Sequence, residues 1–153
     1  MRSLILAAFL AAAFPLAAEI IDNVRGEQIF IRDKGTFTLW GVNLPPGPGA
    51  PFGIPAYHTL REYLARNSKV TCTYPGGKAA IFERNGVDVG LALIRMGLGW
   101  HDETALPVND PRHREYAAAE AAAKSLKLGV WSEKNPPAGV DPGPRRKGRK
   151  RRR

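Results

Sequence analysis

The stretch from Phe37 to Gly49, FTLWGVNLPPGPG, begins as a strand and ends abruptly at two prolines. Proline has no backbone N–H to donate to a neighbouring strand, so Pro45 and Pro46 mark the end of sheet pairing. The end of a rigid strand is a common place for functional groups. This one offers only the hydroxyl of Thr38 and the amide of Asn43, neither of which titrates near neutral pH. The stretch can therefore supply hydrogen bonds, but no acid, base or cation.

The residues around this strand end predict a β-hairpin followed by a loop and a helix. In EQIFIRDKGTFTLWGV (27–42), apolar and polar side chains alternate on both sides of the turn-forming segment Asp33–Gly35. The loop NLPPGPGAPFGIP (43–55) is too rich in Pro and Gly for regular structure. A helix is predicted from about Pro55, because apolar residues then recur at helical spacing.

The second half of the chain predicts two more strands and two more helices. KVTCTY (69–74) and KAAIFERNG (78–86) have strand character, and VDVGLALIRMG (87–97) is a short helix that should stop at its last glycine. A longer helix should be capped by Asp110, have Pro111 in its first position and end at Gly129. Four or five short strands with three helices predict an α+β domain built on a small barrel.

Cys72 is the only cysteine, so the chain can form no disulfide within itself. In VTCTY it alternates with Thr71 and Thr73 and shares a strand face with Val70 and Tyr74. We predict that Cys72 is a small buried core residue. A reactive or intermolecularly paired thiol is the alternative.

The first 18 residues, MRSLILAAFLAAAFPLAA, contain one basic residue, an uncharged apolar run and small residues at the end. This is the pattern of a secretory signal peptide, and we predict cleavage after Ala17 or Ala18. The run is short for a membrane span and contains Pro15, so a permanent anchor is the alternative. The mature protein is therefore predicted to be exported, to the periplasm or the medium.

The formal charge of +9 is concentrated at the C-terminal end of the chain. Outside Arg2 and this tail, 14 Lys and Arg residues balance 14 Asp and Glu residues. We predict a folded domain at 19–134, a Pro- and Gly-rich linker at 135–144 and a disordered basic tail at 145–153. Polyanions such as nucleic acid or an anionic envelope surface should bind the tail, unless it merely aids solubility. Its basic residues are Arg145, Arg146, Lys147, Arg149, Lys150, Arg151, Arg152 and Arg153.

Three stretches go beyond composition: FTLWGVNLPP (37–46), LALIRMGLGW (91–100) and RHREYAAAEAAAKSLKLGVWSE (112–133). In this order and spacing they resemble the thermonuclease family, that is, staphylococcal-nuclease-like domains. The third stretch, an Ala- and Glu-rich helix that leads into Trp-Ser-Glu, is the most specific. The resemblance covers roughly residues 25–134. It implies an OB-fold, a five-stranded β-barrel with three helices, and calcium-dependent hydrolysis of DNA and RNA phosphodiesters.

The resemblance also implies which positions should carry catalysis. The family uses two arginines to bind the phosphate, a glutamate to activate water and two aspartates to hold calcium. Val42 and Pro45 match the family pattern and set the register. In this register Thr38 occupies the first arginine position, Asn43 an aspartate position and Pro46 the glutamate position.

The second arginine position falls on Gly77, or on Lys78 if the loop has slipped by one residue, and the other aspartate position falls on Glu27. Glu27, with the carbonyl oxygen of Asn43, would make only a weak calcium site. No catalytic residue is retained, so we expect a non-catalytic, monomeric protein without a cofactor that binds nucleic acid or another polyanion. The alternatives are an active nuclease with a remodelled site, which would use calcium, and a protein-interaction module with a protein partner.

His58, His101 and His113 are the remaining candidates for a general base. His58 is predicted on the exposed surface of a helix. The segment WHDE (100–103), together with His113, contains metal-ligating residue types, but the spacing fits no standard metal site. A charged loop is the preferred interpretation of this segment.

Overall fold

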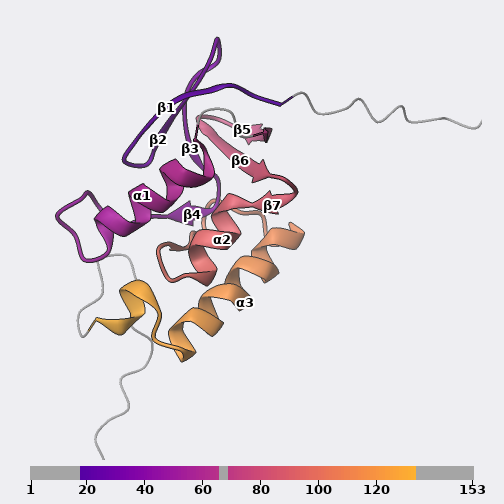
Figure 1. Cartoon of the computed structure of the whole chain (residues 1–153). Coiled ribbons are helices and arrows are strands. Elements are labelled where there is room, and N and C mark those ends of the chain that lie inside the picture. Colours follow the sequence, from indigo (N-terminus) through magenta and orange to yellow (C-terminus); the bar gives the residue numbers. More distant parts are fainter. Residues whose placement is uncertain (1–17, 66–68, 134–153) are drawn as a thin grey trace, which may run out of the picture.

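The computed structural model describes residues 18–65 and 69–133 (Figure 1). The strands in these ranges are β1 (Ile21–Arg25), β2 (Gln28–Ile31), β3 (Gly35–Leu39), β4 (Val42–Asn43), β5 (Val70–Gly76), β6 (Ala79–Arg84), β7 (Val87–Asp88) and β8 (Trp100–His101). The helices are α1 (Gly53–Tyr63), α2 (Val89–Arg95), α3 (Pro111–Ser125) and a short 3₁₀ helix, η1 (Gly129–Ser132). The predicted α+β class with three α-helices is confirmed for this part of the chain.

Five strands form the main path of one sheet, in the order β1-β2-β3-β6-β5, and β7 pairs with β6 beside this path. β1, β2 and β3 form an antiparallel meander, and β5 and β6 form an antiparallel hairpin. The two halves are joined in parallel between β3 and β6, where Thr38 lies opposite Ala79. β4 and β8 form a separate two-stranded antiparallel sheet.

The five-stranded path does not close into a continuous barrel. Its two edges approach each other at an isolated bridge between Glu19 and Val70, where the backbone N of Glu19 donates to the carbonyl O of Val70 at 2.7 Å. The predicted barrel is therefore open between its edge strands, β1 and β5. A bulge between Ile21 and Asn23 also bends β1 and breaks its side-chain alternation. This irregularity explains why the sequence pattern did not predict β1.

The turns and caps follow local sequence signals. Asn85 and Gly86 have φ angles of 52° and 77°, as expected of the tight turn that joins β6 to β7. At the start of α3, the Asp110 side chain accepts a hydrogen bond from the backbone N of Arg112 at 2.8 Å, and Pro111 occupies the first turn. The predicted cap and first position of this helix are confirmed.

The end of α3 differs from the prediction. The helix stops at Ser125, four residues before Gly129. Lys127 then adopts a left-handed φ of 53°, and Gly129 begins η1 instead of ending α3. The other predicted helices begin close to their observed starts, at Gly53 for α1 and Val89 for α2.

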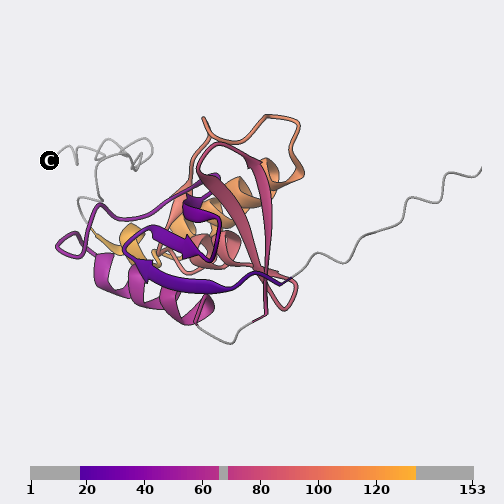
Figure 2. The same ribbon diagram turned by 90° about the horizontal axis from the view of Figure 1, so that it is seen from above.

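The core lies between the sheet and the helices. α2 packs against both β6 and α3, and α1 packs against β1 and α2. Seen from above, the strands lie over α2 and α3, and α1 lies to one side (Figure 2). Cys72 of β5 is 6% exposed within this core, so its predicted burial is confirmed. The largest fully buried side chains include Ile29, Leu60, Phe82, Leu93 and Tyr116.

Several sequence predictions fall outside the described residues. These are the signal peptide over residues 1–17, the linker at 135–144 and the basic tail at 145–153. Within the ranges 18–65 and 69–133, no helix is both long enough and apolar enough to span a bilayer.

Candidate functional site

A cavity of about 290 Å³ brings together three of the residues that the sequence singled out, Glu27, Thr38 and Asn43. They come from three different segments. Glu27 lies in the turn between β1 and β2, Thr38 lies in β3 and Asn43 ends β4. The register derived from the sequence therefore places these residues at one common site in the fold.

The backbone holds Thr38 and Asn43 in place through neighbouring strands. The N–H of Thr38 donates to the carbonyl O of Lys78 at 2.9 Å, beside the parallel pairing of β3 with β6. Asn43 lies opposite Trp100 in the pairing of β4 with β8. Because side chains alternate along a strand, Val42 is buried while Asn43 is exposed. The amide of Asn43 is thus free to border the cavity.

Asp102 also lines this cavity, and the sequence analysis did not select it as a site residue. Its backbone N donates to the carbonyl O of Gly41 at 2.9 Å, which continues the contact between β4 and β8. Its Oδ1 accepts hydrogen bonds from the backbone N and the hydroxyl of Thr104, at 3.0 and 2.7 Å. No local motif marks this position, because only the pairing of two distant short strands brings Asp102 beside Asn43.

The structure does not bring Pro46 or Gly77 to the cavity. Both residues are exposed, and neither is among the residues that line it. Gly77 has a left-handed φ of 63°, and an added Cβ would meet no atom within 4 Å. At the alternative position, the ammonium group of Lys78 lies 5.9 Å from the centre of the Phe37 ring. Phe37 and Thr38 lie on opposite strand faces, so Lys78 is directed away from the side of Thr38.

The loop that contains Pro46 is fixed by Tyr57 of α1. The Tyr57 hydroxyl accepts a hydrogen bond from the backbone N of Gly47 at 2.7 Å and donates to the carbonyl O of Pro45. The loop is therefore anchored on both sides of Pro46. The backbone of Pro46 is thus held in place, exposed and outside the cavity.

The cavity is acidic. Glu27 and Asp102 contribute carboxylates and Asn43 an amide, and none of the described lining residues is Arg, Lys or His. These side chains offer two carboxylates and one amide oxygen, so most of the six to eight oxygen ligands of a calcium ion would have to come from the backbone or from water. Within the described ranges, no three or more His, Cys, Asp or Glu side chains are grouped so that they could hold a metal ion. The described side chains at this cavity therefore do not complete a metal site by themselves.

The histidines lie elsewhere. His58 is on the exposed surface of α1, as the sequence predicted. Its Nδ1 lies 3.5 Å from the Glu62 carboxylate. His101, in contrast, is 6% exposed and lies in β8, so the interpretation of its segment as a charged loop is wrong for this residue. Burial and the neighbouring His113 lower the pKa of His101. Neither His101 nor His113 lines the cavity.

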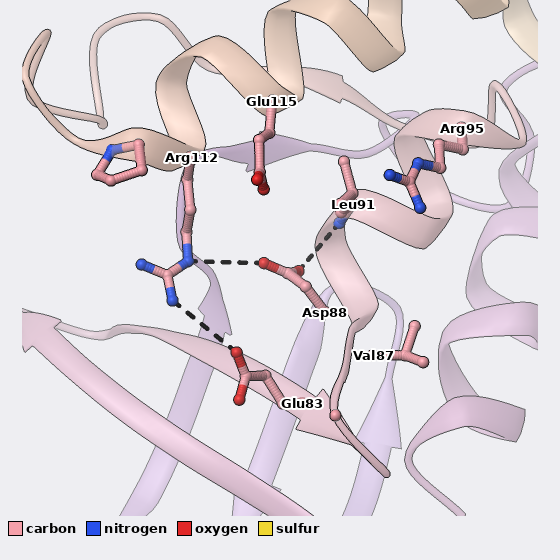
Figure 3. Close-up of a pocket in the computed structure, with 9 residues that line it drawn as sticks. Glu83, Val87, Asp88, Leu91, Arg95, Arg112 and Glu115 are labelled. Carbon is pink, nitrogen blue, oxygen red and sulfur yellow. Dashed lines mark hydrogen bonds and ion pairs between the residues drawn. The ribbon is translucent and has the colours of Figure 1, made fainter.

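A second cavity, of about 500 Å³, lies between β6, β7, α2 and α3. Figure 3 shows Arg112 of α3 between Glu83 and Asp88, with nitrogen–oxygen distances of 3.9 and 3.7 Å. Asp88 also accepts a hydrogen bond from the backbone N of Leu91 at 3.0 Å and from the Tyr116 hydroxyl at 2.8 Å. Asp88 thus has a structural role, because it joins the start of α2 to α3.

The strand order, the three helices and the convergence of Glu27, Thr38 and Asn43 define a staphylococcal-nuclease-like domain. A family model described as "Staphylococcal nuclease homologue" matches residues 36–133, and the chain belongs to this family. It is 31% identical over 131 residues to a protein of Verticillium alfalfae named "Probable endonuclease LCL3". This match covers 74% of the chain and 42% of the relative, so the chain spans less than half the length of that protein.

Proposed function

We propose that this member of the staphylococcal nuclease family is non-catalytic and binds nucleic acid or other polyanions through its basic tail, residues 145–153. One observation carries the proposal. The cavity where Glu27, Thr38 and Asn43 converge contains two carboxylates and an amide, and none of the described residues that line it is cationic.

Phosphodiester hydrolysis places extra negative charge on the phosphate in the transition state. Enzymes stabilise that charge with preorganised donors, and loss of one such donor costs about 2.7–4 kcal/mol. Here the positions of both family arginines hold Thr38 and Gly77, and the position of the water-activating glutamate holds Pro46. Glu27 and Asp102 would in addition repel a phosphate. The cavity therefore opposes the reaction that the family performs.

The tail has the chemistry that the cavity lacks. Eight Lys and Arg residues in nine positions attract phosphates without regard to base sequence, and release of counterions makes such binding fall steeply with salt. The N-terminal signal pattern supports a periplasmic or secreted location. An anionic envelope surface is then the second polyanion that the tail would meet. We further propose that the protein acts as a monomer.

The test uses the full chain and a second full chain in which all eight basic residues of the tail are replaced by Ser. Affinity for one fluorescent oligonucleotide and for anionic vesicles is measured over a salt titration. We expect the parent to bind with steep salt dependence and the neutralised chain to lose most of its affinity. Undiminished binding by the neutralised chain would overturn the tail as the binding element.

The same preparations are incubated with DNA and RNA in calcium, with and without chelator. We expect no chelator-sensitive cleavage. The alternative of an active nuclease with a remodelled site is favoured by the convergence of Asp102 with Glu27, and by the name of the fungal relative. Cleavage that chelator, Glu27→Gln and Asp102→Asn each abolish would establish that alternative. Absence of both cleavage and polyanion binding would leave the protein-interaction module as the better function.

A further inference from the structure

His101 is unusual among the polar side chains of the described residues, because it is only 6% exposed. Its Nε2 atom is buried and has no hydrogen-bond partner, and the same holds for the Nδ1 atom of His113. An imidazole nitrogen is always either an N–H donor or a lone-pair acceptor, so a buried one without a partner is unfavourable. Two such nitrogens on neighbouring rings require a common explanation.

The two rings meet edge to face. Their centres are 4.8 Å apart and their planes are inclined at 77°. His101 belongs to β8 and His113 to the first turn of α3, so the ring contact joins the strand to the start of the helix. In neutral imidazoles, one ring can donate its N–H to the lone pair of the other.

The surroundings of the pair contain several other titratable groups. Glu120 of α3 accepts a hydrogen bond from the backbone N of His101 at 2.8 Å and forms an ion pair with Lys124 at 2.6 Å. Asp102 and Glu103 follow His101 in the chain and favour a positive charge on it. The Tyr116 ring faces His101 at 6.0 Å, and its hydroxyl is committed to Asp88.

We propose that His101 and His113 form an acid-sensitive latch: contact between the two rings holds the first turn of α3 against β8 while the buried His101 ring is neutral, and protonation of His101 in mild acid releases that turn. A protonated His101 carries an N–H on both ring nitrogens, and its buried Nε2 has no acceptor to receive that hydrogen. The new positive charge then lies beside His113 in the first turn of α3, at the positive N-terminal end of that helix. This latch is distinct from the polyanion-binding tail and does not depend on it.

The direction of the pH effect follows from linkage. In the unfolded chain each histidine takes up its proton near pH 6.5. In the folded protein, burial and His113 lower the pKa of His101, so the folded state binds fewer protons over the interval below about pH 6.5. Stability is therefore fully present above this interval and falls as the pH falls through it.

The experiment follows urea unfolding of the full chain between pH 7.5 and 5.0, and records the NMR titration of the histidine rings. A difference of one bound proton makes the unfolding equilibrium constant rise up to about tenfold per pH unit. In His113→Gln we expect the pKa of His101 to move up toward its ordinary value and the pH dependence of stability to weaken. Hydrogen-exchange protection in the first turn of α3 should fall in acid before protection in its last turn.

His58→Gln is the matched control, because His58 is exposed on α1, away from the pair, and should leave the pH dependence unchanged. An unchanged titration of His101 in His113→Gln would overturn the proposal. If that variant does not fold, an ordinary titration of His101 in the parent protein would do the same. All measurements are repeated with chelator, and a chelator-dependent titration would mean that the pair holds a metal ion, which also contradicts the latch.

Discussion

Gly97 and Gly129 are packed backbone against backbone. The carbonyl O of Gly97 accepts a hydrogen bond from the backbone N of Val130 at 2.9 Å. A Cβ added to Gly129 would lie 2.1 Å from that same oxygen, and one added to Gly97 would lie 2.3 Å from the carbonyl O of Leu128. Both glycines also have left-handed φ angles, of 69° and 51°. This contact joins the end of α2 to the start of η1.

Gly97→Ala and Gly129→Ala should therefore each destabilise the protein strongly. The left-handed φ alone costs an alanine about 1–2 kcal/mol, and a backbone clash adds to it. We expect at least 3 kcal/mol in total from urea unfolding, near the upper end of single-mutant effects. Gly77→Ala is the control, since Gly77 has a similar φ but open space around it. Equal costs at all three positions would show that the backbone contact is unimportant.

The hydrogen bond from Tyr116 to Asp88 should contribute measurably to stability. Tyr116→Phe leaves the partly buried carboxylate of Asp88 without this donor, and we expect a loss of about 1–3 kcal/mol in urea unfolding. The control is Tyr63→Phe, which removes the hydroxyl of a half-buried tyrosine at the end of α1. A Tyr116→Phe variant as stable as this control would contradict the prediction.

The buried hydroxyl of Tyr116 should also make the protein less stable at alkaline pH. Burial, followed by the charge of Asp88, raises its pKa above the ordinary value of 10. The unfolded chain therefore loses this proton before the folded protein does, and stability falls as the pH rises above about 10. Absorbance titration should detect fewer tyrosines ionising in the parent than in its urea-unfolded form before unfolding begins, because burial also raises the pKa of Tyr74 to about 12. Tyr116→Phe should remove one of these late-ionising tyrosines. If all the tyrosines ionise together in the folded protein, Tyr116 is not buried as described.

Cys72 should react slowly with thiol reagents in the folded protein. Burial raises the pKa of its thiol to about 11, and only the thiolate is nucleophilic. At pH 8, a disulfide reagent should modify it many times faster in urea than in buffer. Equal rates in both conditions would support the alternative of a reactive cysteine.

The site itself can be tested by adding back family residues that lie at the cavity. Thr38→Arg with Asn43→Asp should give detectable nucleotide binding, because the new guanidinium lies where a phosphate would be held. Cleavage should remain at background, since Pro46 and Gly77 lie outside the cavity. Calorimetry with a nucleoside bisphosphate and a nuclease assay measure the two effects. Cleavage by this double variant would mean that the remaining carboxylates can activate water.

The parts of the fold that follow from neighbouring residues were predictable from the sequence. The Asp110–Pro111 helix start and the Asn85–Gly86 turn each depend on the conformational preferences of adjacent residues. The burial of Cys72 follows from strand alternation, and the register of Thr38 and Asn43 from a motif. These signals all act over a few residues. The structure confirms the helix start, the turn and the burial of Cys72.

The parts that depend on distant pairing were not predictable. Asp102 joins the cavity, and His101 becomes buried, only because β8 pairs with β4. Both strands have two residues, too few for any periodic pattern to appear. The left-handed φ of Gly77 likewise depends on the local path of the chain between β5 and β6. The residue type at position 77 can be read from the sequence, but the direction of the backbone there cannot.

The pairing of Asn43 with Trp100 also sets an order of events during synthesis. The ribosome releases the segment that contains Glu27, Thr38 and Asn43 well before it makes β8, because translation proceeds from the N-terminus. Until β8 appears, β4 has no partner strand and the cavity lacks one of its walls. The nascent chain therefore carries an unfinished site for much of its translation, and no N-terminal fragment that stops short of Trp100 contains it.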